Sequence, residues 1–240
     1  MKKIGILGHY LGPNSFGLTK PYLNFFSMFG EVVIITPFDI AVREDLDLLV
    51  LPGGPDVWPD RYRDADEDFH FLTGEPRMEF ERFDAILLPG YIQKRVPIFG
   101  ICRGHQSLAV HFGGHLKQHM YHETNKHDKR DEWVHGLDIF HDAANLIEGL
   151  PKAMFDVNSL HHQVVDRIPF NAKVLARYRN HKNPKHNEIE AITYWPNYPA
   201  HTVQWHPEEI RDDFSMYLIE HLLVAGKQLE IVEQRELVQG

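Results

Sequence analysis

The 240-residue sequence predicts an α/β fold, with a doubly wound, mostly parallel sheet that carries helices on both faces. Short apolar runs rich in β-branched residues alternate with helix-like segments through the first hundred residues, which is the pattern of β-α-β units. One run ends in a Pro-Gly-Gly turn and another ends at a cysteine between two glycines. No linker marks a domain boundary, so residues 1–240 are predicted to form a single domain.

The first half of the chain alternates strand and helix. Strands are predicted at residues 2–8, 31–37 and 46–51, and a helix at residues 18–29 that ends at Gly30.

Two segments of the first half, residues 47–54 and 84–91, look like copies of each other. A strand at the second copy would leave no room for a crossover helix before the next strand, which begins at Val96. We therefore expect residues 77–94 to form that helix, distorted at Pro89-Gly90.

The second half is richer in strand-like runs. A helix at residues 105–112 is stopped by Gly113-Gly114, and an amphipathic helix covers residues 214–224. Strands are predicted at residues 116–120, 134–140, 172–178, 188–194 and 201–205. Residues 58–73 and 121–133 are predicted to be surface loops.

Charge and cysteine content narrow the class of protein. The formal net charge of −9 would repel a nucleic-acid backbone or an anionic membrane, so small molecules or proteins are the expected partners. No run of eighteen apolar residues is present. A single cysteine excludes an intrachain disulfide and suits a reducing compartment, so a cytoplasmic location is expected.

The cysteine lies in the pentapeptide Gly100-Ile101-Cys102-Arg103-Gly104, between an apolar run and a helix-like segment. This sequence pattern resembles the nucleophile elbow motif G-x-S-x-G, with a thiol in place of the hydroxyl. A helix N-terminus favours the thiolate, because the helix dipole is positive there. Cys102 is therefore predicted to be a nucleophile.

A cysteine nucleophile needs a base, and the base needs an orienting group. His206 and Glu208 are two residues apart, which would place both side chains on the same side of an extended chain, with Pro207 pointing away and ending the strand. The carboxylate could then hold the imidazole in the correct tautomer.

Acyl transfer also needs donors for the developing oxyanion. The backbone N–H of Arg103 is one candidate, and the turn at Gly53-Gly54 supplies the other.

Five motifs in order along the chain resemble those of the class I glutamine amidotransferase superfamily, most closely its gamma-glutamyl-gamma-aminobutyrate hydrolase branch, peptidase family C26. They lie at residues 51–57, 97–104, 157–163, 189–192 and 204–208. The resemblance implies the flavodoxin-like sheet of that superfamily and a Cys-His-Glu triad formed by Cys102, His206 and Glu208.

The resemblance also implies a set of substrate contacts. Gln106 matches the family position that contacts the glutamate portion of the substrate, and the segment from Asn158 to Gln163 borders the family's substrate site. The candidate binding residues are therefore Gln106, Asn158, Ser159, His161 and His162. Adjacent histidines point in different directions, so at most one of His161 and His162 is expected to face the cleft.

Three functions stay open. The first is a hydrolase that cleaves a γ-glutamyl amide through a γ-glutamyl thioester and releases glutamate. The second is a glutaminase subunit that delivers ammonia to a separate synthase, and the third is a non-catalytic binding module on the same fold. No cofactor and no metal site are predicted, because the histidines between residues 111 and 127 have no cysteine partner and no H-E-x-x-H spacing. The chain is expected to be a monomer or a homodimer.

Overall fold

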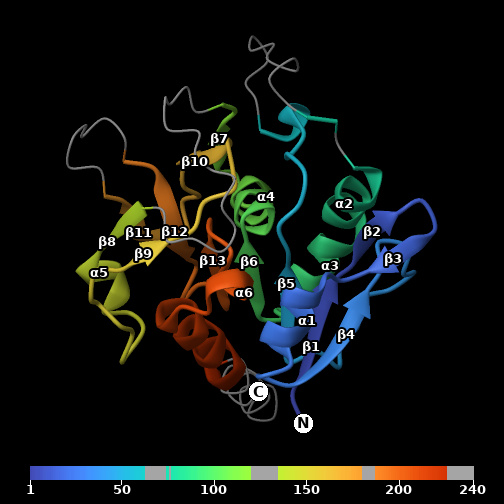
Figure 1. Ribbon diagram of the computed structural model, residues 1–240, viewed down its shortest axis with the longest axis horizontal. Helices are drawn as coiled ribbons and strands as arrows, with labels where there is room; N and C mark the ends of the chain where they lie inside the picture. Colours follow the sequence, from blue (N-terminus) through green and yellow to red (C-terminus); the bar gives the residue numbers. More distant parts are fainter. Residues whose placement is uncertain (63–73, 76, 120–134, 180–186, 226–240) are drawn as a thin grey trace, which may run out of the picture.

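The computed structural model describes residues 1–62, 74–75, 77–119, 135–179 and 187–225 (Figure 1). Most of the loop predicted at residues 58–73, the whole loop predicted at 121–133 and the chain after residue 225 lie outside the described residues.

The described residues build a sheet of eleven strands that runs through both halves of the chain. Its first five strands are parallel neighbours. In spatial order they are β4 (Glu31–Ile35), β1 (Lys3–Leu7), β5 (Leu48–Leu51), β6 (Ile98–Ile101) and β13 (Ala200–Val203). The predicted α/β fold is thus confirmed in the part that carries the glycine turn and the cysteine.

The C-terminal half extends the sheet with antiparallel strands. These are β12 (Ile189–Thr193), β11 (Lys173–Tyr178), β8 (His135–Ile139) and β9 (Asp156–Val157), with β10 (Val164–Arg167) and β7 (His115–Lys117) pairing beside them. A separate hairpin of β2 (His9–Gly12) and β3 (Ser15–Gly17) follows β1, in a segment for which the sequence predicted no strand.

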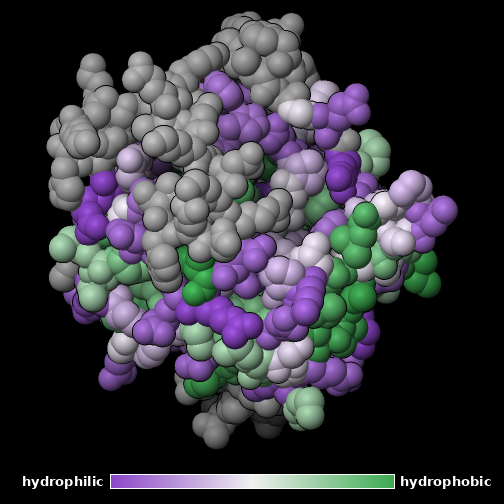
Figure 2. Space-filling view, viewed as in Figure 1, coloured by the Kyte–Doolittle hydropathy of each residue, from purple (hydrophilic) through white to green (hydrophobic). Residues whose placement is uncertain are grey.

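Helices cover both faces, and each face has its own hydrophobic core. One core takes side chains from α1 (Lys20–Phe26), α5 (His141–Ala144) and the helix at residues 213–225. The other takes them from α4 (Arg103–His111) and from the crossover helix. The short helices η1 (Pro59–Arg61) and α6 (Pro207–Ile210) complete the described helices. Figure 2 shows a largely hydrophilic described surface, with hydrophobic residues gathered near α1 and the β2–β3 hairpin.

The crossover helix is distorted, as predicted. It consists of α2 (Met78–Arg82), the π-helical segment η3 (Phe83–Leu87) and α3 (Leu88–Gln93). Proline has no N–H and its ring crowds the carbonyl four residues earlier, here that of Ala85. The wider π turns therefore lie before Pro89 rather than at Pro89-Gly90.

The pairing of β13 with β6 brings the two ends of the candidate site together. Val203 lies beside Ile101, and the Cys102 N–H donates to the Val203 carbonyl at 2.8 Å. Chain segments a hundred residues apart therefore leave the same edge of the sheet side by side. None of the described helices is both long and apolar enough to cross a membrane.

Candidate active site

Cys102 sits in a strained turn between β6 and α4. Its φ of 50° and ψ of −103° are rare for a residue with a side chain. The flanking glycines allow this turn, because a Cβ at Gly104 would collide with the Leu51 carbonyl and one at Gly100 would stand 2.8 Å from the Gly104 carbonyl oxygen. The pentapeptide therefore has the tight strand-turn-helix geometry expected of an elbow, and it presents the thiol at the N-terminus of a nine-residue helix.

His206 and Glu208 are in contact, although not on an extended chain as predicted. β13 ends at Val203, and Pro207 is the first residue of α6. Proline suits that position because its fixed φ matches a helix and its missing N–H is not needed there. Glu208 lies in the first helical turn, and its Oε1 is 2.7 Å from the Nδ1 of His206. The short helix, rather than strand alternation, pairs the two side chains.

The environment of His206 favours its protonated form. Burial by itself lowers the imidazole pKa, but the Glu208 carboxylate and the Cys102 thiol outweigh burial and raise the pKa to about 10. At neutral pH the ring is therefore an imidazolium whose Nδ1–H donates to Glu208.

Asn158 holds the backbone of His206 from both sides. Its Oδ1 accepts from the His206 N–H at 2.9 Å and its Nδ2 donates to the His206 carbonyl at 3.1 Å. Asn158 is fully buried. Its amide is thus committed to His206, which does not match the substrate contact that the resemblance implied.

Replacing Asn158 with alanine is expected to lower the free energy of unfolding by about 3 kcal/mol, because two buried backbone groups lose their partner at about 1–3 kcal/mol each. Urea denaturation followed by fluorescence measures this change. The exposed Asn145 provides the matched control, Asn145→Ala, which should leave the unfolding midpoint nearly unchanged. Equal midpoints for the two variants would show that the hydrogen bonds between Asn158 and the His206 backbone contribute little to stability.

The two turn glycines pack against different partners. The Gly53 N–H donates to the Tyr22 hydroxyl at 2.8 Å, and a Cβ at Gly53 would stand 2.6 Å from Cε1 of His206. At Gly54 an added Cβ would stand 2.8 Å from the Phe80 ring. Because the N–H of Gly53 is already bonded, the prediction that both glycines serve an oxyanion does not fit Gly53. The N–H of Gly54 is the better candidate.

Tyr22 lies between the Gly53-Gly54 turn and the Glu208 carboxylate. Burial, followed by the nearby charge of Glu208, raises the pKa of the Tyr22 hydroxyl well above its usual value, so Tyr22 stays protonated. Helix α1 supplies this residue, and the sequence analysis did not single it out.

The backbone and the side chain of Arg103 make separate contributions to the site. Its backbone opens α4 next to the thiol. Its buried guanidinium points into the crossover helix, where Nη2 is 2.8 Å from Oε1 of Glu81 and Nη1 is 2.9 Å from Oδ2 of Asp84. Asp84 also binds Arg61, and the Arg103 guanidinium lies 4.7 Å from the Phe80 ring centroid. This network anchors the turn after Cys102 to the crossover helix.

The remaining predicted binding residues do not line the cavity that contains Cys102, and most of them bond to other parts of the protein. Gln106 is buried, and its Nε2 donates to the Gln163 carbonyl at 2.8 Å and to Oε1 of Gln204 at 3.1 Å. His161 is buried with Nδ1 3.1 Å from the same Gln163 carbonyl, Ser159 is buried, and His162 contacts Asp56 at 2.9 Å. Between them, Leu160 is the residue of this segment that lines the cavity.

A cavity of about 440 Å³ opens at the edge of the sheet above the cysteine. Its lining includes Cys102, His206, Glu208, Gly53 and Gly54. It also includes residues that the sequence analysis missed, namely His9, Thr19, Tyr22, Pro55, Arg77, Phe80, Leu160 and Glu209. Within the described ranges, no three His, Cys, Asp or Glu side chains are grouped so as to hold a metal ion.

Comparison with known proteins identifies the family. The family model for peptidase C26 matches residues 14–208. The chain belongs to the peptidase C26 family. The predicted resemblance to this branch of the class I glutamine amidotransferase superfamily is therefore confirmed, and the family supports a hydrolase that acts on amide bonds.

Several relatives align with most of the length of this peptidase C26 chain. The gamma-glutamyl-gamma-aminobutyrate hydrolase of Escherichia coli O157:H7 is 28% identical over 230 residues, covering 87% of this chain and 84% of the relative. Component 2 of the aminodeoxychorismate/anthranilate synthase of Bacillus subtilis is 27% identical, with 73% and 82% covered. A glutamine amidotransferase relative from Mycobacterium tuberculosis is 28% identical, and the match spans 83% of this chain but only 65% of that protein.

A solved structure supports the fold assignment. A glutamine amidotransferase from Thermotoga maritima superposes with a TM-score of 0.56 at 18% identity, covering 98% of this chain and 85% of the other. This likeness concerns the fold, and it confirms the predicted class I glutamine amidotransferase architecture for this peptidase C26 member.

Proposed function

We propose that this peptidase C26 member is a cysteine-dependent hydrolase of γ-glutamyl amides, with Cys102 as nucleophile, His206 as acid and base, and Glu208 as the group that orients His206. The observation that carries the proposal is their meeting in one cavity, with the Glu208 carboxylate 2.7 Å from the imidazole and the thiol close enough to raise the imidazole pKa. We also infer that the chain forms one domain, because strands from both halves share one sheet.

The proposed reaction has two halves. The cycle starts with the proton of Cys102 on His206. The Cys102 thiolate attacks the γ-carbonyl carbon and a C–S bond forms, and the C–N bond breaks as the protonated His206 gives its proton to the departing amine. Water then attacks the γ-glutamyl thioester, His206 takes up the proton of that water, and glutamate leaves with the thiolate restored. Glu208 keeps the ring in one tautomer throughout.

Two backbone groups are proposed to stabilise the oxyanion. The N–H of Arg103 follows the nucleophile in the elbow, and the N–H of Gly54 belongs to the facing turn. The salt bridges of Arg103 to Glu81 and Asp84 support this role, because they join the elbow to the helix that carries Phe80, and the same guanidinium lies over the Phe80 ring against which Gly54 packs.

The test is glutamate release by the purified, reduced protein from glutamine and from a panel of γ-glutamyl amines. We expect release from at least one γ-glutamyl amine, and rapid quenching followed by mass spectrometry should trap the γ-glutamyl thioester on Cys102. A folded protein that releases glutamate from no member of the panel and forms no adduct would contradict the proposal.

A second candidate function is a glutaminase subunit that passes ammonia to a separate synthase. It is favoured by the Bacillus subtilis relative, whose name makes it one component of a synthase. This function predicts slow hydrolysis of glutamine by the chain alone. The free-standing hydrolase predicts cleavage of γ-glutamyl amines in preference to glutamine, so the same panel separates the two.

A further inference from the structure

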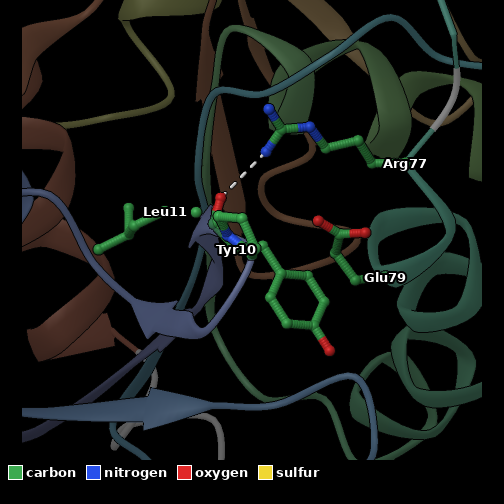
Figure 3. A pocket seen from close by; sticks show the side chains of 6 residues that line it. Tyr10, Leu11, Arg77 and Glu79 are labelled. Atoms are coloured by element: carbon green, nitrogen blue, oxygen red, sulfur yellow. Dashed lines mark hydrogen bonds between the residues drawn. The ribbon is translucent and has the colours of Figure 1, made fainter.

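Figure 3 shows a second cavity, of about 420 Å³. It is lined by Tyr10, Leu11, Gly12, Pro13, Arg77 and Glu79. Arg77 lines both cavities, and in two places consecutive residues divide between them: His9 then Tyr10, and Glu79 then Phe80. The second cavity is therefore an outer extension of the first, and Arg77 stands at their junction.

The wall of the outer cavity carries one positive and one negative side chain. The Arg77 guanidinium donates one hydrogen bond, from Nη1 to the Tyr10 carbonyl at 3.2 Å (Figure 3). Among the described residues its other N–H groups meet no acceptor, so they can bind an anion. Glu79 is only 8% exposed, and its Oε1 has no hydrogen-bond partner among the described residues. Within that part of the chain the two side chains form no ion pair with each other.

A buried carboxylate oxygen without a partner is costly, and a ligand donor or cation at that point would remove the cost. The neighbouring His9 does not supply such a cation. Burial, and then the charge of Arg77, lower the pKa of His9 below its usual value, and the smaller opposing effect of the Glu79 charge does not reverse this, so the neutral ring is favoured at pH 7. The hairpin residues Tyr10 and Leu11 give the cavity an apolar side, against which an aliphatic chain could pack.

We propose that the outer cavity binds the amine portion of the substrate and selects γ-glutamyl dipeptides whose second residue is a basic amino acid. This inference rests on the proposed hydrolase function. The carboxylate of the second residue lies close to the scissile amide and meets Arg77 at the junction. The cationic end of its side chain lies farther out and meets Glu79. The order of the two charges along the cavity matches their order in such a substrate.

Three substrates that differ by one group test the proposal. γ-Glutamyl-lysine, linked through the lysine α-amine, carries both charges. γ-Glutamyl-norleucine lacks the ammonium, and γ-glutamyl-cadaverine lacks the carboxylate. We expect kcat/KM for γ-glutamyl-lysine to exceed that of each of the other two by about tenfold, the scale of one added charged contact.

Two variants assign each preference to its residue. Glu79→Gln should bring the lysine-to-norleucine ratio close to one, whereas Arg77→Gln should bring the lysine-to-cadaverine ratio close to one. Glu31→Gln, at an exposed glutamate at the start of β4, is the matched control and should keep both ratios. Using ratios within each variant removes any general loss of activity from the comparison.

Binding to the Cys102→Ala variant, measured by calorimetry, tests the cavity without turnover. Tighter binding of γ-glutamyl-lysine than of γ-glutamyl-norleucine, lost in the Cys102→Ala/Glu79→Gln double variant, would support the cavity even if catalysis fails. Equal binding and equal kcat/KM for these two substrates would overturn it. Glutamate release from the panel in that case would leave the hydrolase proposal intact.

Discussion

Replacing Cys102 with alanine is expected to lower kcat/KM for the preferred γ-glutamyl amide by about 10,000-fold or more. The thiol is the only proposed group that can form a bond to the γ-carbonyl carbon, and the neighbouring imidazolium and oxyanion donors cannot replace it. Steady-state glutamate release and the rapid-quench assay for the thioester measure the change. The adduct should disappear completely.

The alanine variant should keep its fold, so that the loss can be assigned to chemistry. Cys102 is buried and its strained φ of 50° costs alanine about what it costs cysteine. The melting temperature and the circular dichroism spectrum should therefore stay close to those of the wild type. Residual activity within tenfold of the wild type would exclude Cys102 as the nucleophile.

Replacing Glu208 with glutamine is expected to lower kcat by about 1,000-fold and to change its pH dependence. The carboxylate makes the largest of the contributions that raise the pKa of His206 to about 10, so the wild-type imidazolium should persist through neutral pH and activity should fall only at alkaline pH. Without that negative charge the imidazole pKa falls. The alkaline limb of the variant should therefore lie at a lower pH than that of the wild type.

The pH profile of kcat between pH 6 and 10.5 measures this shift. Glu220→Gln removes an equal charge from an exposed position on the helix at residues 213–225, and it should keep the wild-type profile. An alkaline limb that stays in place in Glu208→Gln, or moves to higher pH, would show that the carboxylate does not set the protonation of His206.

The parallel half of the fold follows directly from the sequence pattern. Strands β1, β5 and β6 are mostly apolar runs of a buried sheet and β4 is a more exposed edge strand, and all four lie where the pattern predicts them. The turn at Gly100-Ile101-Cys102-Arg103-Gly104 was predictable for the same reason, because its two glycines are needed by backbone contacts that any such turn makes. The hairpin of β2 and β3 was not predictable in this way, since its three- and four-residue strands carry no clear alternation.

The surroundings of the candidate site depended on contacts that the sequence does not encode locally. Asn158 is followed by several polar residues, and only the fold shows that its amide holds the backbone of His206, 48 positions away. Tyr22 belongs to an aromatic helix face that also reads as core. The pairing of His206 with Glu208 was predicted from strand periodicity, whereas the first turn of a short helix produces it. Such contacts follow from tertiary packing, which overrides local pattern.

The pairing of β6 with β13 has a consequence for biosynthesis. Cys102 emerges from the ribosome before the strand that carries its partner exists, and residues 103–206 must be added before His206 is available. At about 5–20 residues per second, that interval is roughly 5 to 20 seconds. A nascent chain stalled within this interval carries a thiol with no adjacent imidazolium, so glutamate release should begin only when the segment through Glu208 has left the exit tunnel.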